Sequence, residues 1–239
     1  MFHRDVMISI VIPTLNEAQA LPVLLTALQN EWADHETIVV DGGSQDGTVE
    51  IARQRGVRVL QAPAGRGNQL CAGVAEARGE ILLFLHADSI FPVGGLARIG
   101  EVLSADRRLA GGNFRLVFDG DTRFSRWLTR FYARLRRVGL YYGDSGIFVR
   151  RSAYDAIGGF RSIPVMEDLD FVRRLERLGR TCCIGEPALI TSSRRFEGRR
   201  ALAIVRGWFE LHLLFFLGMS PGRLAKIYKA QAPRSREWG

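Results

Sequence analysis

The first hundred residues repeat one pattern: a short apolar run rich in β-branched residues, a polar turn, and then apolar residues at helical spacing. This alternation predicts strands joined by crossover helices, and therefore a largely parallel sheet in an α/β fold. The predicted strands are Ile8–Ile12, Thr37–Val40, Val57–Leu60 and Ile81–Leu85. The predicted helices between them lie near Leu21–Leu28, Thr48–Arg55 and Gln69–Ala77.

The pattern loosens after Phe91. Helices are predicted at Leu96–Leu103, Thr122–Val138, near Ala153, Glu167–Leu178 and Ala201–Leu217, and strands at Gly112–Phe118, Gly146–Val149 and within Cys182–Ile190. No linker or repeat divides the chain of 239 residues. We therefore expect one catalytic domain over residues 1–200, with an apolar helix and basic tail over residues 201–239 that is not an independent domain.

Polar turns follow the first two predicted strands, where an open parallel sheet binds its ligands. The first turn is Pro13–Glu17, in which Asn16 is expected to cap a helix and to leave N–H groups that favour an anion. The second begins at Asp41, whose carboxylate can accept hydrogen bonds from a base or a ribose. The glycines after it let a flat ring approach the backbone, although ordinary turns also use Asp and Gly.

His86 and Asp88 follow a strand that is apolar without alternation, as expected of a strand covered on both faces. A hard divalent cation prefers the oxygen ligands of Asp88, while His86 is a softer ligand. The pair therefore predicts a Mn²⁺ or Mg²⁺ site. The alternative is that His86 only hydrogen-bonds to the backbone.

Three acids, Glu167, Asp168 and Asp170, open a predicted helix. Acids in a first turn are ordinary partners of the helix dipole, but three in four residues suggest that one turns inward as a general base. Asp170 can equally be a cap or a solvated charge. Further on, Arg194 and Arg195 suit a diphosphate, because each guanidinium can hold two oxygens, although one of them can be a surface charge.

The chain carries 33 basic and 25 acidic residues, and only Lys226 and Lys229 are lysines. Phosphate-rich ligands or an anionic membrane would suit this excess, whereas no recognition helix or aromatic–basic strand surface predicts a nucleic-acid partner. A basic stripe and an aromatic stripe share the predicted helix Thr122–Val138, which is either a solvated surface helix or a lipid contact. Helix Ala201–Leu217 is too short to span a membrane and would dock on a membrane or on a second subunit as a homo-oligomer.

Three cysteines, Cys71, Cys182 and Cys183, lack metal-ligand spacing. They are interpreted as small core residues of a protein in a reducing, cytoplasmic compartment. The polar start of the chain runs into a strand and does not resemble a signal peptide.

Several motifs, taken in order, resemble the family-2 glycosyltransferases of GT-A fold. They are ISIVIPTLNE at Ile8–Glu17, DGGSQDGT at Asp41–Thr48, GRGN at Gly65–Asn68, FLHAD at Phe84–Asp88, GDSG at Gly143–Gly146 and the acids Glu167–Asp168. The resemblance covers roughly Met7 to Phe196. Within the family the chain looks most like the bacterial branch called selenodomain-associated transferase 2.

The resemblance implies a role for each matching position. Pro13, Thr14 and Glu17 would line the nucleotide pocket, with Asp41 at the base and Arg66 beside the base or the phosphates. Asp88 matches the second acid of an Asp–any–Asp metal motif. Asp168 matches the acid that deprotonates the acceptor, and Glu167 beside it is the second catalytic candidate. The GDSG motif would place its first three residues on the acceptor side: Gly143, Asp144 and Ser145.

Two departures accompany the resemblance. His86 replaces the first Asp of the metal motif, and the Gln–any–any–Arg–Trp motif of processive polymerising members is missing. The expected activity is inverting transfer of a sugar from a UDP- or GDP-linked donor by metal-assisted single displacement. The acceptor is left open, with a lipid-linked one among the candidates. The alternatives are a nucleotidyltransferase, which would need a glycine-rich loop after the first strand, and a non-catalytic protein that binds nucleotides or lipids.

Overall fold

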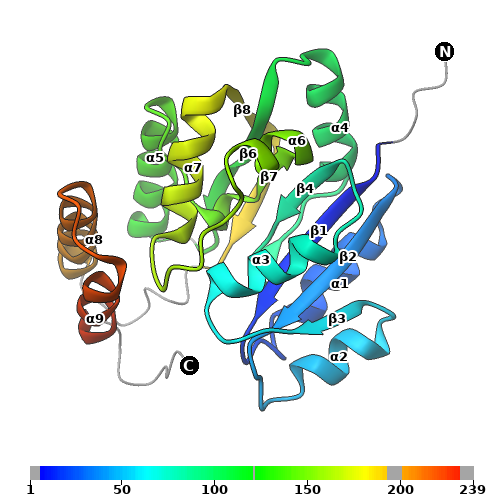
Figure 1. The fold of residues 1–239 in the computed structure, drawn as a ribbon, viewed down its shortest axis with the longest axis horizontal. Helices are drawn as coiled ribbons and strands as arrows, with labels where there is room; N and C mark the ends of the chain where they lie inside the picture. Colours follow the sequence, from blue (N-terminus) through cyan, green and yellow to red (C-terminus); the bar gives the residue numbers. More distant parts are fainter. Residues whose placement is uncertain (1–5, 121, 193–200, 232–239) are drawn as a thin grey trace.

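The computed structural model describes residues 6–120, 122–192 and 201–231 (Figure 1). Its strands are β1 Ile8–Thr14, β2 His35–Asp41, β3 Arg58–Gln61, β4 Ile81–Phe84, β5 Ser89–Ile90, β6 Leu109–Phe118, β7 Ile147–Arg150 and β8 Arg180–Thr191. Its helices are α1 Leu21–Gln29, α2 Thr48–Gln54, α3 Arg66–Glu76, α4 Gly95–Ala105, α5 Arg123–Arg137, the 3₁₀ turn η1 Gly143–Ser145, α6 Arg151–Ala156, α7 Glu167–Leu178, α8 Ala201–Phe216 and α9 Pro221–Gln231.

The strands form one mixed sheet in the order β3-β2-β1-β4-β7-β6-β8-β5. The first four strands are mutually parallel, as the βα alternation predicts. β7 pairs antiparallel with both β4 and β6, and β8 is parallel to β6 but antiparallel to β5. Six of the eight strands therefore point the same way, and the predicted α/β fold with a mostly parallel sheet is confirmed.

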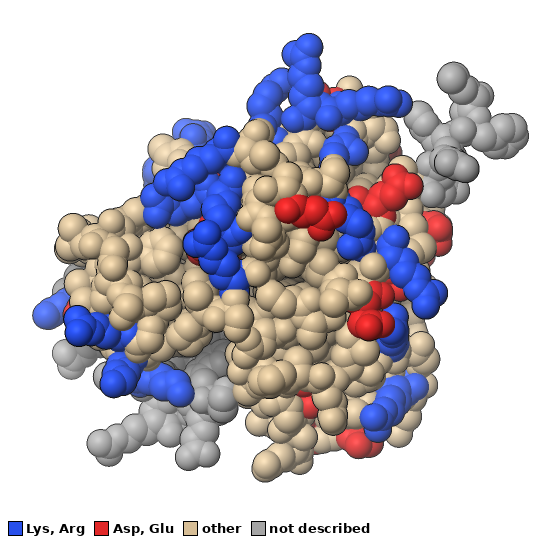
Figure 2. All heavy atoms as spheres, viewed as in Figure 1, with Lys and Arg blue, Asp and Glu red and all other residues tan. Residues whose placement is uncertain are grey.

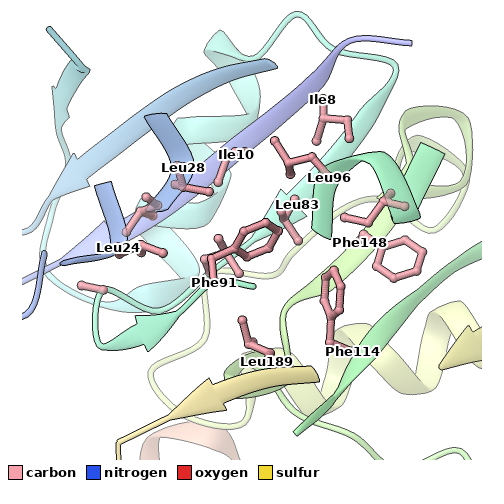
Figure 3. Packing of buried hydrophobic residues seen from close by; sticks show 14 of the residues in the cluster. Ile8, Ile10, Leu24, Leu28, Leu83, Phe91, Leu96, Phe114, Phe148 and Leu189 are labelled. Atoms are coloured by element: carbon pink, nitrogen blue, oxygen red, sulfur yellow. The ribbon is translucent and has the colours of Figure 1, made fainter. Parts of the chain in front are cut away.

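Side chains of alternate residues in each strand enter two separate cores. Leu83 faces the layer of α1, α4 and α5, while Leu82 and Phe84 face the layer of α3, α6 and α7. Figure 3 shows the first core, where Phe114 packs edge-on against the rings of Phe91 and Phe148 at centroid separations of 5.6 and 6.0 Å. Burial on both faces explains why the central strands read as continuous apolar runs.

The antiparallel pairing of β4 with β7 decides where the site forms. Phe84, the last residue of β4, is paired with Ile147, the first residue of β7. The chain that leaves β4 and the chain that enters β7 therefore lie at the same edge of the sheet. His86 follows β4 and η1 precedes β7, so two segments about sixty residues apart in the sequence meet at this edge.

Helices α8 and α9 lie side by side at one end of the molecule, beside α5 and α7 (Figure 1). Leu211 of α8 and Leu224 of α9 are buried against Val165, Met166 and Leu169 around the start of α7. Within residues 6–120, 122–192 and 201–231, every helix is too short or too polar to span a bilayer.

Several local predictions were wrong. Asn16 caps no helix: α1 begins at Leu21, and the Asn16 side chain instead accepts a hydrogen bond from the Gln45 amide. The segment Cys182–Ile190 belongs to one long strand, which continues through two register shifts. Cys183 is exposed and is not a core residue.

The described part of the predicted basic tail forms a helix, α9. Its Leu224 is fully buried, while Lys226 and Lys229 are exposed. The charged residues of this segment made its one apolar face difficult to recognise in the sequence.

Candidate active site

The loops after β1 and β2 are joined around the carboxylate of Asp41. This side chain is 1% exposed, and its Oδ2 accepts hydrogen bonds of 2.9 Å from the amides of Gly43 and Ser44. Its Oδ1 accepts from the hydroxyls of Thr14 and Ser44. Asp41 thus fixes the shape of the predicted nucleotide loop from within, and its contact with a base stays a prediction.

Further contacts hold the two loops together. The amide of Asn16 donates to Ser44 Oγ at 2.8 Å, and the amide of Glu17 donates to Thr48 Oγ1 at 2.9 Å. Asn16 has a φ of 55°, a left-handed conformation that Asn tolerates better than most residues. The loop conformation is therefore set before any ligand binds.

Helix α3 connects these loops to the acids of α7. Gln69 is buried, and its Nε2 donates to the carbonyls of Thr14 and Val40, each at 2.8 Å. One turn earlier on the same helix, Arg66 Nε forms an ion pair of 2.6 Å with Glu167 Oε1. Both ends of the candidate site thus depend on the placement of one helix.

The Arg66–Glu167 pair is asymmetric in its exposure. The Glu167 side chain is 3% exposed, whereas the Arg66 side chain is 35% exposed. Burial raises the pKa of Glu167, and the nearby Asp168 raises it further, whereas the positive charge of Arg66 lowers it. The carboxylate of Glu167 raises the pKa of Arg66 in turn. Glu167 is therefore a partner that positions Arg66 rather than an open carboxylate.

Among the acids in the first turn of α7, Asp168 is the one whose side chain faces a cavity. Its Oδ2 accepts a hydrogen bond of 2.9 Å from the Gly143 amide, and its Oδ1 accepts one of 2.7 Å from the Leu169 amide. A Cβ atom added to Gly143 would lie 2.9 Å from His86 Nε2 and 3.5 Å from Asp168 Oδ2. Glycine at this position thus lets the imidazole and the carboxylate approach the same stretch of backbone.

The residue before these acids carries local strain. Met166 precedes α7 with a φ of 63°, which costs a non-glycine residue about 1 kcal/mol. This turn directs Glu167 toward Arg66 and Asp168 toward Gly143. Asp170 instead pairs with Arg174 and Arg161.

Residues of η1 complete this end of the site. Asp144 and Ser145 are both buried, and Ser145 Oγ donates to the Tyr142 carbonyl at 2.6 Å. The Tyr142 hydroxyl and His212 Nε2 lie 2.9 Å apart, so η1 is tied to α8. Burial and the nearby Asp168 and Asp144 raise the pKa of Tyr142, which keeps its phenol protonated at neutral pH.

A cavity of about 420 Å³ opens beside these groups. Its polar end is formed by Arg66, His86, Asp144 and Asp168. The rest of its lining comes mainly from apolar and aromatic residues of α5, α8 and the start of α7. A much smaller pocket joins Pro13 to Arg66, His86, Gly143 and the two acids.

The side chains near the end of β4 offer few ligands for a divalent cation. The described part of the chain contains no cluster of three His, Cys, Asp or Glu side chains arranged to bind a metal. Asp88 and His86 can supply one oxygen and one nitrogen at the end of β4, which leaves most ligand positions to others. Mg²⁺ and similar ions are commonly held by one or two protein groups together with substrate phosphates, so the donor set fits a cation that arrives with a diphosphate.

The structure brings seven of the predicted site residues to one place: Pro13, Arg66, His86, Gly143, Asp144, Glu167 and Asp168. Thr14 and Asp41 end the neighbouring strands β1 and β2, Glu17 lies in the loop after β1, and Asp88 is half-buried two residues beyond His86. Arg194 and Arg195 lie outside the described residues. Sequence reasoning missed Gln69, although a polar residue on the apolar face of a helix was a usable signal. It also missed the pairing of Tyr142 with His212, for which the sequence holds no signal.

Comparisons with known proteins agree with this geometry. The family described as Glycosyl transferase family 2 matches residues 9–161. A PGL/p-HBAD biosynthesis glycosyltransferase of Mycobacterium tuberculosis is 34% identical over 199 residues, which cover 77% of this chain and 72% of the relative.

Two solved structures share the fold. One is the mannosyltransferase PcManGT from Pyrobaculum calidifontis in complex with GDP-Man and Mn²⁺, with a TM-score of 0.66, 20% identity, and coverage of 94% of this chain and 68% of that one. The other is glucosyl-3-phosphoglycerate synthase from Mycobacterium tuberculosis in complex with Mn²⁺ and UDP-glucose. Its TM-score is 0.59 at 21% identity, with coverage of 87% and 78%.

Proposed function

Because the chain belongs to glycosyl transferase family 2, we propose that it transfers a hexose from a UDP- or GDP-linked donor to an acceptor hydroxyl with inversion at the anomeric carbon. The observation that supports this proposal most directly is the position of Asp168. Its carboxylate lines a cavity large enough for an acceptor and lies at the same sheet edge as the Asp41 loop. The resemblance of these motifs to those of the family supports the same assignment.

In the proposed reaction, the acceptor oxygen attacks the anomeric carbon while its proton passes to Asp168. The bond from the anomeric carbon to the diphosphate oxygen breaks, and the diphosphate leaves with the electron pair. The hydrogen bonds from Gly143 and Leu169 hold the carboxylate in place, and a positioned base of this kind contributes about 10²–10⁴-fold to the rate. Arg66, held by Glu167, places a positive charge at the same end of the cavity.

We propose that Asp88 and His86 hold Mn²⁺ or Mg²⁺ together with the donor diphosphate. When bound, the cation would offset the negative charge that develops on the leaving group. The two solved structures described above are complexes with Mn²⁺. Imidazole is a softer ligand than carboxylate, so His86 favours Mn²⁺ of the two ions.

We also propose that the protein attaches peripherally to the inner face of the cell membrane. Four apolar side chains of α8 and the following residue are exposed: Phe209, Leu213, Phe216 and Leu217. Exposed cations of α9 lie at the same end of the molecule, together with the exposed Glu210 of α8. On the face drawn in Figure 2, most of the visible acidic side chains lie away from this end. An apolar stripe beside cations suits anionic lipid, which these cations favour over a second copy of the chain. Absence of binding to anionic vesicles at low salt would contradict this attachment.

The transfer is tested by incubating the protein with UDP-glucose or GDP-mannose, with and without Mn²⁺, and measuring the released nucleoside diphosphate. Slow release that depends on the cation supports a transferase. Formation of pyrophosphate from a nucleoside triphosphate and a sugar phosphate would instead indicate a nucleotidyltransferase. If neither reaction occurs and nucleotide sugars do not raise the melting temperature, the proposal is wrong.

A further inference from the structure

The cavity beside Asp168 has two chemically different ends. Arg66, His86, Asp144 and Asp168 form the polar end. The rest of the wall is mainly apolar and aromatic, with Tyr132 and Trp208 packed edge-to-face at a centroid separation of 6.1 Å. Its polar members are Tyr228 and the mutually bonded Tyr142 and His212. A hydrophilic sugar acceptor would leave its hydroxyls without hydrogen-bond partners along most of this wall, at considerable cost.

The apolar wall continues to the surface of the protein. Phe209 and Phe216 both line the cavity, yet their side chains are 69% and 47% exposed. They are continuous with the exposed Leu213 and Leu217 of the same helical segment. An apolar group that starts at the acids can therefore follow these side chains to the surface. This favours a long chain over a compact ring system, which an enclosed pocket would suit better.

The wall is anchored to the polar end. His212 Nδ1 donates to the Trp208 carbonyl at 2.7 Å, and His212 Nε2 lies 2.9 Å from the Tyr142 hydroxyl. One turn further along α8, at its last residue, the guanidinium of Arg173 on α7 lies 4.6 Å from the ring centre of Phe216. These contacts hold α8 in register with η1 and α7, so that the apolar wall and Asp168 form one site.

On this basis, which rests on the proposed function, we propose that the acceptor is a hydroxyl-bearing membrane lipid. Its apolar chain occupies the cavity between α5, α8 and α7, and its hydroxyl lies at Asp168. The chain leaves the cavity past Phe209 and Phe216, toward the α8 surface that would meet the membrane. A volume of about 420 Å³ is within the range of sites that enclose most of a drug-sized molecule, so it holds the first part of a lipid chain and not its whole length.

Binding is tested with 12-bromododecan-1-ol, whose bromine quenches nearby tryptophan fluorescence. We expect saturable quenching that 1-dodecanol reverses and that is mostly lost in Trp208→Phe. Affinity should rise about fourfold per methylene from 1-hexanol upward and level off once the chain reaches solvent. Quenching of equal strength in Trp208→Phe, or an affinity independent of chain length, would overturn the inference.

A matched pair of substitutions locates the binding. Val205 lines the cavity, so Val205→Phe should weaken alkanol binding at least tenfold, whereas Val23→Phe on the exposed face of α1 should not change it. Melting curves check that both variants fold. If Val205→Phe does not fold, Leu135→Phe is used in its place. Equal binding by both valine variants places the alkanol elsewhere, and stronger binding of 4-phenylphenol than of 1-dodecanol makes the occupant an aromatic ring. Either result contradicts a lipid chain in this cavity.

A separate measurement distinguishes this inference from the proposed function. Wild-type protein is given UDP-glucose or GDP-mannose with Mn²⁺, and diphosphate release is followed with and without 1-dodecanol, with mass spectrometry to detect dodecyl glycoside. Faster diphosphate release together with glycoside formation supports both the transferase activity and the lipid acceptor. Diphosphate release without alkanol binding removes only the lipid acceptor, while alkanol binding without any donor turnover removes the transferase.

Discussion

The amide of Gly143 donates a hydrogen bond of 2.9 Å to Oδ2 of Asp168, joining the turn before β7 to the start of α7. These residues are 25 positions apart in the chain, and the contact orients one carboxylate oxygen beside the cavity. It gives the proposed base a fixed direction before an acceptor binds.

Asp168→Asn should abolish transfer and leave nucleotide-sugar binding within a few-fold of wild type. The amide keeps an oxygen to accept from Gly143 but cannot take the acceptor proton, so a rate loss of about 10²–10⁴-fold is expected. Steady-state kinetics and titration with the donor measure the two effects. Asp170→Asn is the control, since that carboxylate pairs with Arg174 and does not line the cavity. Unchanged turnover in the Asp168 variant would remove this residue from the mechanism.

Gly143→Ala should lower turnover roughly tenfold or more with little change in melting temperature. The added methyl would lie 2.9 Å from His86 Nε2, so the imidazole or the Asp168 carboxylate must move. Even a small shift of either group would disturb the alignment of the base with the acceptor hydroxyl. Gly100→Ala in α4 is the control, because its added Cβ would meet no atom within 4 Å apart from its chain neighbours and the backbone of its own helix. Wild-type kinetics in the Gly143 variant would show that the close approach is unimportant.

Arg66→Met should destabilise the fold, and by more at pH 8 than at pH 5. Burial raises the pKa of Glu167 above its ordinary 4.5, and the substitution removes the cation that opposes this rise. A carboxyl whose pKa is raised in the folded state stabilises it fully below the unfolded pKa and loses that contribution as pH rises through the folded pKa. The loss at pH 8 should be about 2 kcal/mol, less than for a fully buried pair because water reaches Arg66. Urea unfolding at the two pH values measures it, and an equal loss at both would contradict the raised pKa.

His86→Asp should raise the ratio of the Mg²⁺-supported rate to the Mn²⁺-supported rate. The substitution exchanges an imidazole for a carboxylate, and Mg²⁺ prefers oxygen ligands more strongly than Mn²⁺ does. Diphosphate release with each ion, after removal of metal with EDTA, gives the ratio for both proteins. A ratio identical to that of wild type would mean that His86 does not contact the cation.

The four parallel strands and three crossover helices could be predicted because each is a local pattern of apolar residues. The place of β7 could not. Ile147, Phe148 and Val149 are buried and show no alternation, so their sequence carries no information about which strand they pair with or in which direction. Without that pairing, the hydrophobic pattern does not place η1 beside His86, and only the family resemblance puts both in one site.

The three acids of α7 show the same limit within a single turn. Their pattern predicts a helix start and suggests that one acid faces inward, but only the family resemblance singles out Asp168. In the structure Glu167 is the buried one and is paired with Arg66, Asp168 faces the cavity, and Asp170 pairs with Arg174. The left-handed turn at Met166 sets this division, and a methionine gives no warning of such a conformation.

The family match ends at residue 161, whereas α8 and α9 begin forty residues or more later. On the proposed chemistry, the groups that recognise the donor and those that enclose the acceptor chain therefore lie largely on different stretches of polypeptide. Exchange of the last two helices between relatives, by recombination or in a designed chimera, would change which alcohol is glycosylated while the activated sugar stays the same.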